Sequence, residues 1–96
     1  MKPSEALLIH RKAIRDIIES HHGCNARVFG SALRSEDTDN SDLDILMDPT
    51  AETTLFDIGA IRRELRELLG IPVDVITPNA LPENIRAKVL AEAQAV

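Results

Sequence analysis

Two aspartates stand two positions apart at the start of an apolar run, in the stretch Asp42-Leu43-Asp44. Side chains of a strand alternate between the two faces of a sheet, so both aspartates are expected to point to one side and the leucine to the other. A third aspartate, Asp74, interrupts a later apolar run that ends at Ile76. If the two runs form neighbouring strands, three carboxylates converge, and their repulsion has to be compensated.

A divalent cation removes that repulsion. Mg²⁺ binds a few carboxylates and keeps open positions for water and for substrate phosphates. Two such ions about 3.5–4 Å apart can activate an attacking oxygen and stabilise a leaving one. The three aspartates therefore suggest metal-assisted chemistry on a phosphate ester or anhydride.

A glycine and a serine, Gly30 and Ser31, follow a short apolar segment. A glycine after a strand lets the backbone approach a ligand closely. A serine that opens a helical turn presents its hydroxyl and nearby N–H groups to an anion. Phosphates would then bridge these donors and metal ions held by the acids.

Each of these residues also has a structural interpretation. Gly30 and Ser31 could form only a turn and a helix cap. Asp42 could protect a strand edge from aggregation, Asp44 could pair with an arginine, and Asp74 could be a buried, hydrogen-bonded acid. Taken singly, the residues leave these alternatives open, and their order and spacing together favour a site for phosphate chemistry.

Gly30-Ser31, ten further residues and then Asp42-x-Asp44 form an order that resembles the motif of the DNA polymerase β-like nucleotidyltransferases. Asp74 matches the third carboxylate of that family. Over nearly its full length the chain is similar to the minimal nucleotidyltransferase (MNT) domains. These serve as antitoxins beside HEPN-domain toxins, and some of them transfer AMP from ATP to a tyrosine of the toxin.

The resemblance implies an enzyme that transfers AMP from ATP to a hydroxyl, expected to be a tyrosine, of a cognate HEPN toxin. It assigns a two-metal Mg²⁺ site to Asp42, Asp44 and Asp74, with Asp74 also helping to deprotonate the acceptor. It assigns the binding of ATP phosphates to Gly30, Ser31 and Arg34. The alternative is a non-catalytic antitoxin that neutralises its partner by forming a complex. Because the chain is short, a partner or a second copy would have to complete the site, as a homo- or hetero-oligomer.

The elements that position these residues are predicted from apolar spacing, caps and breakers. Ser4 is expected to cap the first helix, Thr54 and Asp57 the second, and Gly23 and Gly70 to end them. Ile58, Ile61, Leu65 and Leu68 are expected to form the inner face of the second helix, and Ile85 and Val89 that of the third. The fold expected for residues 1–96 is one α/β domain with a small mixed three-stranded sheet and helices packed on one face. The expected helices are 4–20, 54–69 and 83–95, the strands are 27–29, 42–47 and 71–77, and a helical turn is expected at 31–34.

The balance of 16 acidic against 11 basic residues gives a net charge of −5, which speaks against binding to nucleic acid or an anionic membrane. No apolar stretch approaches the roughly 18 residues of a membrane span. A single cysteine excludes an intrachain disulfide and fits a reducing cytoplasm. His10 is expected to be partly buried, and Cys24 is expected to pack as a small hydrophobe. A solvated loop is expected at Glu36, Asp37 and Asp39. The arginines Arg62, Arg63 and Arg66 are expected to form either a solvated helix face or part of a partner interface.

Overall fold

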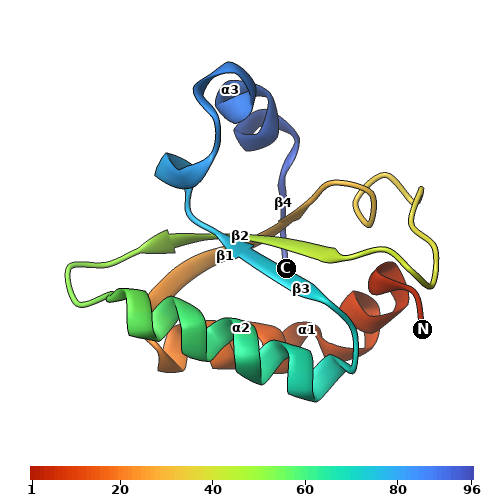
Figure 1. Ribbon diagram of the computed structural model, residues 1–96, viewed down its shortest axis with the longest axis horizontal. Coiled ribbons are helices and arrows are strands. Elements are labelled where there is room, and N and C mark those ends of the chain that lie inside the picture. The colour runs from red at the N-terminus through yellow and green to blue at the C-terminus, as the bar shows by residue number, and fades with distance from the viewer.

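A four-stranded sheet lies at the centre of the structure, which is a computed structural model describing residues 1–96 (Figure 1). In chain order the elements are α1 (Pro3–Ser20), β1 (Gly23–Phe29), β2 (Leu43–Pro49), α2 (Leu55–Leu69), β3 (Val73–Ile76), the 3₁₀ turn η1 (Pro78–Ala80), α3 (Glu83–Glu92) and β4 (Gln94–Ala95). The strand order is β3-β2-β1-β4. β1 is antiparallel to both of its neighbours, whereas β2 and β3 are parallel.

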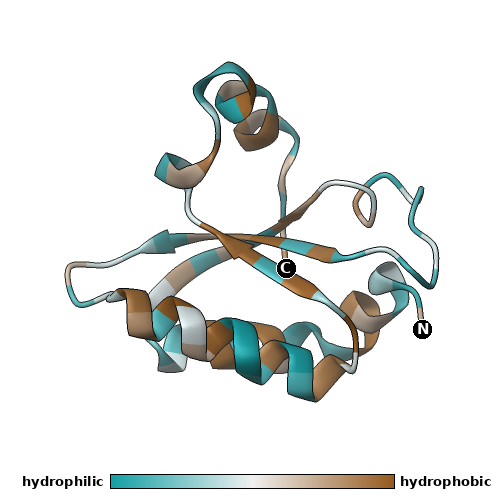
Figure 2. Cartoon of the chain, in the orientation of Figure 1, coloured by the Kyte–Doolittle hydropathy of each residue, from teal (hydrophilic) through white to brown (hydrophobic).

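The main apolar core lies between the sheet and the two helices that cover one of its faces, α1 and α2 (Figures 1 and 2). The alternation predicted for β2 is confirmed, since Leu43, Ile45 and Met47 are fully buried in this core. Each such side chain contributes roughly 1.5–3 kcal/mol by leaving water. Leu46 is also fully buried but does not belong to this core, because its side chain points to the opposite face. No helix is both long enough and apolar enough to cross a bilayer.

The start of α1 is stabilised by a residue from a distant loop. The N-cap position is Lys2, whose side chain makes no cap bond, so the predicted Ser4 cap is wrong. Instead, the Ser4 N–H donates a 2.8 Å hydrogen bond to the Asp37 carboxylate. That bond is the main cause of the lowered pKa of Asp37. The Asp37 side chain is buried, so its expected place in a solvated loop is wrong, whereas Glu36 and Asp39 are exposed as predicted.

The turn between α1 and β1 uses a different left-handed residue from the one predicted. His22, not Gly23, has a positive φ, of 64°. Gly23 begins β1, where a Cβ atom would lie 2.7 Å from the Cε atom of Met47. The glycine is therefore required by the close packing of the strand, and not by a helix cap. The hydroxyls of Thr50 and Thr53 hold the turn by donating to the His22 carbonyl at 2.9 and 2.6 Å.

The first part of β1 contains a bulge, and the strand begins at Gly23 instead of the predicted residue 27. The register with β2 shifts between Cys24 and Arg27, where Asn25 has a φ of 51°. Cys24 comes just before this shift in the chain and is exposed. The expectation that Cys24 packs as a small hydrophobe is therefore wrong, whereas His10 is partly buried as expected.

The ends of α2 follow the prediction closely. The Thr54 hydroxyl accepts a hydrogen bond from the Asp57 N–H at 3.2 Å, and the Asp57 carboxylate accepts one from the Thr54 N–H at 2.8 Å. Gly70 ends the helix in the left-handed conformation, with a φ of 68°. The predicted inner face needs one correction, because Leu69 is buried whereas Leu68 is 39% exposed.

The C-terminal segment differs most from the sequence expectation. α3 ends at Glu92, and Gln94 and Ala95 form β4, a fourth strand beside β1. α3 lies on the side of the sheet opposite to α1 and α2, so the helices do not all pack on one face (Figure 1). None of its residues is fully buried, and Ile85 is 40% exposed, so the prediction for Ile85 is wrong, whereas Val89 is partly buried. The mixed α/β class itself is confirmed.

Candidate active site

Two of the predicted site acids lie at the beginning of β2. Asp42 directly precedes the strand and is exposed, whereas Asp44 lies within it and is partly buried. Because Leu43 and Ile45 point into the core, both carboxylates belong to the face turned away from α1 and α2. The prediction that the two aspartates share one face is therefore confirmed.

Asp74 joins them from the neighbouring strand. The register of β2 and β3 pairs Asp44 directly with Asp74, and neighbouring strands lie about 4.8 Å apart. The pairing is parallel because α2 carries the chain back across the sheet between the two strands. The Asp74 side chain is 43% exposed, which does not fit a buried structural acid. The predicted adjacency of Asp44 and Asp74 is confirmed, whereas the three aspartates are not gathered in an arrangement that could already hold a metal ion.

Gly30 brings the backbone after β1 against the Asp44 carboxylate. The register of β1 and β2 places Phe29 opposite Asp44, and Gly30 follows with a φ of 78°. A Cβ atom at Gly30 would overlap the Oδ2 atom of Asp44. Glycine is thus required both by the backbone conformation and by the space that the carboxylate occupies. This contact ties the Gly-Ser turn to the acids.

The predicted helical turn after Gly30 is present. The Arg34 N–H donates to the Gly30 carbonyl at 3.3 Å, and Ser35 ends the turn with a φ of 56°. Ala32 is buried and anchors the turn to the core. The first N–H groups of such a turn have no partner within it. The start of the turn, at Ser31, therefore offers donors next to Gly30, the residue that contacts Asp44.

The acids interact electrostatically with one another and with one arginine. Burial raises the pKa of Asp44, and the negative charges of Asp74 and Asp42 raise it further. The positive charge of Arg34 acts in the opposite direction, although the Arg34 Nε atom also lies 3.1 Å from Glu36 Oε2. The site has an excess of negative charge, which a bound cation would neutralise.

The donor set suits a hard divalent cation, because Mg²⁺ prefers carboxylate oxygens. No three Asp, Glu, His or Cys side chains of the chain are already gathered at metal-ligating positions. A cation between the strands would therefore have to draw the carboxylates closer together. The assignments of Asp42, Asp44 and Asp74 to metal, and of Gly30, Ser31 and Arg34 to phosphate, stay predictions.

Arg66 is a neighbour of the site that the sequence did not indicate. It was expected on a solvated or partner-binding face of α2, but its Nη2 atom lies 3.9 Å from the Asp74 Oδ1 atom. Both side chains are about two-fifths exposed, so the ion pair alone stabilises little. The Arg66 Nε atom also donates to the Val73 carbonyl at 3.1 Å and so ties α2 to β3. The short connection after Gly70 could have suggested this contact.

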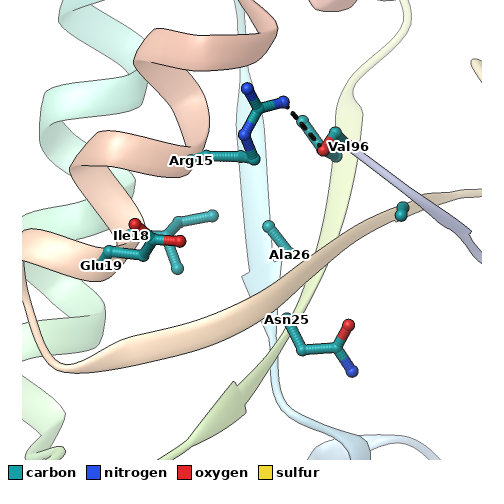
Figure 3. Close-up of a pocket in the computed structure, with 7 residues that line it drawn as sticks. Arg15, Ile18, Glu19, Asn25, Ala26 and Val96 are labelled. Atoms are coloured by element: carbon teal, nitrogen blue, oxygen red, sulfur yellow. Dashed lines mark hydrogen bonds between the residues drawn. The ribbon is translucent and has the colours of Figure 1, made fainter.

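A separate cavity of about 210 Å³ lies beside the C-terminus, and none of the site acids lines it (Figure 3). Arg15 Nη1 donates to the Val96 carbonyl at 3.1 Å, and the Val96 N–H donates to the Ala26 carbonyl at 3.0 Å. These bonds fasten the end of the chain to α1 and β1. The cavity is therefore explained by the anchoring of the C-terminal strand.

A mixed sheet that carries aspartates on adjacent strands beside a Gly-Ser turn agrees with the resemblance to the polymerase β-like nucleotidyltransferases. Residues 12–96 match the family model "Polymerase beta, Nucleotidyltransferase", and the chain belongs to this family. A solved chain described as "Structure of putative minimal nucleotidyltransferase" superposes with a TM-score of 0.87 at 34% identity, covering 97% of this chain and 95% of that one. The domain is thus a transferase domain of the minimal nucleotidyltransferase type.

Relatives over most of the chain carry a more specific name. The chain is 38% identical over 85 residues to "Putative protein adenylyltransferase MJ0435" of Methanocaldococcus jannaschii, a match that covers 88% of this chain and 90% of the relative. It is 33% identical over 86 residues to "Protein adenylyltransferase MntA" of Thermococcus cleftensis, which covers 90% of this chain and 84% of the relative.

Proposed function

We propose that the chain transfers AMP from ATP to a hydroxyl group of a protein, and that this protein is a cognate HEPN-type toxin which the transfer neutralises. The favoured acceptor is a tyrosine, and the reaction is placed in the cytoplasm, where ATP is available. The names of two relatives, given above, support a protein as the acceptor. The observation that carries the proposal is the contact of Gly30 with Asp44, because it joins a phosphate-binding type of turn to a metal-binding type of acid.

The proposed roles are those that the resemblance to the family implies, and the positions of Asp44, Asp74 and Gly30 support them. Asp42 and Asp44 would hold Mg²⁺, and Asp74 would complete a second metal position beside them. The ions would neutralise the negative charge that develops on the phosphates. The Ser31 hydroxyl and the N–H groups after Gly30 would orient the terminal phosphates, and Arg34 would add positive charge there.

In the transfer, the acceptor oxygen forms a bond to the α-phosphorus of ATP. The bond between that phosphorus and the oxygen bridging to the β-phosphate breaks, and pyrophosphate leaves with that oxygen. The proton of the acceptor hydroxyl passes to the Asp74 carboxylate. Asp74 suits this role because it is partly exposed and borders the open edge of the sheet.

The acceptor has to be positioned by its own protein, because the chain is small and its acids lie on an open face. Orientation of the reacting groups is a large part of such catalysis. A stable complex with the toxin would supply it. The same complex could neutralise the toxin without any transfer, which is the alternative function.

The test uses the chain purified together with the toxin encoded beside it, incubated with ATP and Mg²⁺, and reads the intact mass of the toxin. We expect mass increments of one or more AMP groups with the native chain and none with Asp44→Asn. The matched control is Asp16→Asn, which changes an exposed acid of α1 that pairs with Lys12 at 2.7 Å, and it should behave like the native chain. A tight complex whose toxin never gains mass, with Mg²⁺ or Mn²⁺, would refute the transfer and support the alternative.

A further inference from the structure

A groove of about 430 Å³ separates α2 from the outer edge of β3. Its lining includes Leu55, Ile58 and Gly59 of α2 and Asp74, Val75 and Ile76 of β3. The groove is mostly apolar, and Asp74 belongs both to it and to the acidic site. An occupant of this groove would therefore lie beside the Asp74 carboxylate.

β3 is an edge strand, since its only neighbour in the sheet is β2. The Pro72 carbonyl accepts a hydrogen bond from the Leu43 N–H at 3.0 Å and so faces β2. The next carbonyl, of Val73, faces the opposite side, where Arg66 Nε donates to it at 3.1 Å. Successive residues of a strand alternate in this respect, so the N–H and C=O of Val75 point to the open edge. An unpaired edge of this kind is a template for a further strand.

Gly59 has no role in the packing of the chain itself. It lies inside α2, where glycine is the least favourable residue after proline. A Cβ atom at this position would meet nothing within 4 Å, and the φ of Gly59 is not positive. Neither the helix nor the core requires a glycine here. A bare helix backbone beside an apolar groove leaves room for a side chain that comes from outside.

The surroundings of the groove combine apolar side chains with one arginine that has no ion pair, Arg62, which lines the groove. Arg63, Arg66 and Glu67 lie with Gly59 on the adjoining surface of α2. Arg63 pairs with Glu67 at 3.5 Å and Arg66 with Asp74 at 3.9 Å, so Arg62 is the positive charge available to a partner. Leu55 and Phe56, at the start of α2, are 86% and 90% exposed. A partner that fits this surface combines apolar side chains with acidic ones.

We propose that the groove between α2 and β3 is the docking site of the protein substrate. An extended segment of the substrate adds to β3 as a further strand, by hydrogen bonds with the backbone of Val75. One of its apolar side chains lies over Gly59, and one of its acidic side chains lies against Arg62. The segment carries the acceptor hydroxyl to Asp74. Only this last step rests on the proposed transfer of AMP, because the docking itself needs neither ATP nor metal.

The test is a titration of the isotope-labelled chain, followed by NMR, with a nine-residue peptide that alternates glutamate and valine around a central tyrosine. We expect shifts of the Gly59 and Val75 amide signals and a Val75 hydrogen exchange that is slower by about tenfold or more at saturation. A peptide N-methylated at the residues that pair with β3 should bind at least about tenfold more weakly. The N-methylated peptide tests the pairing with β3 without any change to the chain.

Two variants of the chain test the place of binding. Gly59→Trp fills the groove and should weaken peptide binding about tenfold or more, whereas the chain itself should keep its melting temperature because the position is open. Leu8→Trp is the matched control, since it adds the same indole at a 72% exposed position of α1, and it should bind the peptide like the native chain.

The proposal is overturned if the peptide leaves the exchange of Val75 unchanged up to millimolar concentration, or if the two tryptophan variants bind alike. It is also overturned if Val75 is already protected in a dimer of the chain alone, because a second copy then occupies the edge. If the peptide docks but no AMP is transferred to the toxin, the proposed function is refuted and the docking proposal stands. If AMP is transferred but β3 is never protected, the docking proposal is refuted and the proposed function stands.

Discussion

Replacing Gly30 by alanine tests the contact on which the site is built. The left-handed conformation, with a φ of 78°, costs a residue with a Cβ atom about 1–2 kcal/mol. The new Cβ atom would also overlap Asp44 Oδ2, so the carboxylate has to leave its rotamer, at a further cost of about 0.5–1.5 kcal/mol. We expect Gly30→Ala to lose roughly 2–3 kcal/mol of unfolding free energy, or about 10–20 °C in melting temperature.

Gly70→Ala is the matched control. Gly70 has a similar φ, of 68°, but a Cβ atom there would meet nothing within 4 Å. This variant should lose only the conformational cost of about 1–2 kcal/mol. The effect of alanine on the unfolded chain is common to both variants and cancels in the comparison.

Urea unfolding of the single and double variants provides the assay. In the Asp44→Ala background the colliding oxygen is absent, so the cost of Gly30→Ala should fall to that of Gly70→Ala. The difference is the coupling energy of the two positions, expected at about 1 kcal/mol. If Gly30→Ala costs no more than Gly70→Ala and shows no coupling to Asp44, the Gly-Ser turn does not rest against this acid and the reasoning fails.

Three further predictions concern the acids. Burial and like charges raise the pKa of Asp44, so the native chain should lose stability as pH rises from the ordinary pKa of 3.8 through the raised one. The Asp44→Asn variant should lack this loss and be equally or more stable than the native chain at neutral pH. If urea unfolding shows that the variant is less stable by more than about 2 kcal/mol, Asp44 makes a structural hydrogen bond instead. The lowered pKa of Asp37 means that its stabilisation of α1 is complete above pH 3.8 and disappears as pH falls through the lowered pKa. Asp37→Ala should lose about 1 kcal/mol of unfolding free energy at neutral pH, and its stability should depend less on pH in the acid range. If the dependence of stability on pH is unchanged in this variant, Asp37 does not cap the helix. Mg²⁺ with ATP should stabilise the folded chain by about 2.7 kcal/mol at a ligand concentration a hundredfold above Kd, and so raise its melting temperature. An equal rise in the double variant Asp42→Asn/Asp44→Asn would show that the ligand binds elsewhere.

The parts of the site that depend on local rules could be predicted from the sequence. The shared face of Asp42 and Asp44 follows from the alternation of a strand, which any apolar run of this kind shows. The caps of α2 at Thr54 and Gly70 follow from the chemistry of helix ends. The pairing of Asp44 with Asp74 needed one further rule, that a crossover helix returns the chain parallel to its start.

The parts that the sequence did not reveal depend on contacts between distant residues. Asp37 caps a helix through a residue 33 positions away, so its own loop carries no sign of that role. Gln94 and Ala95 follow a helical pattern and form a strand only because the outer edge of β1 accepts them. Ile85 suggested a buried face, but α3 lies across the sheet from the main core and has no buried residue.

The most direct measurement of the central claim follows the two ends of the triphosphate. The chain and its toxin are incubated with Mg²⁺ and ATP that is labelled either at the α-phosphate or at the γ-phosphate, and the label on the toxin is counted. The transfer of AMP predicts that the α-label stays on the toxin and that the γ-label leaves as pyrophosphate, in equal amounts. A γ-label on the toxin would show a kinase, and a toxin without either label in a stable complex would show an antitoxin that acts by binding alone; either result would contradict the account.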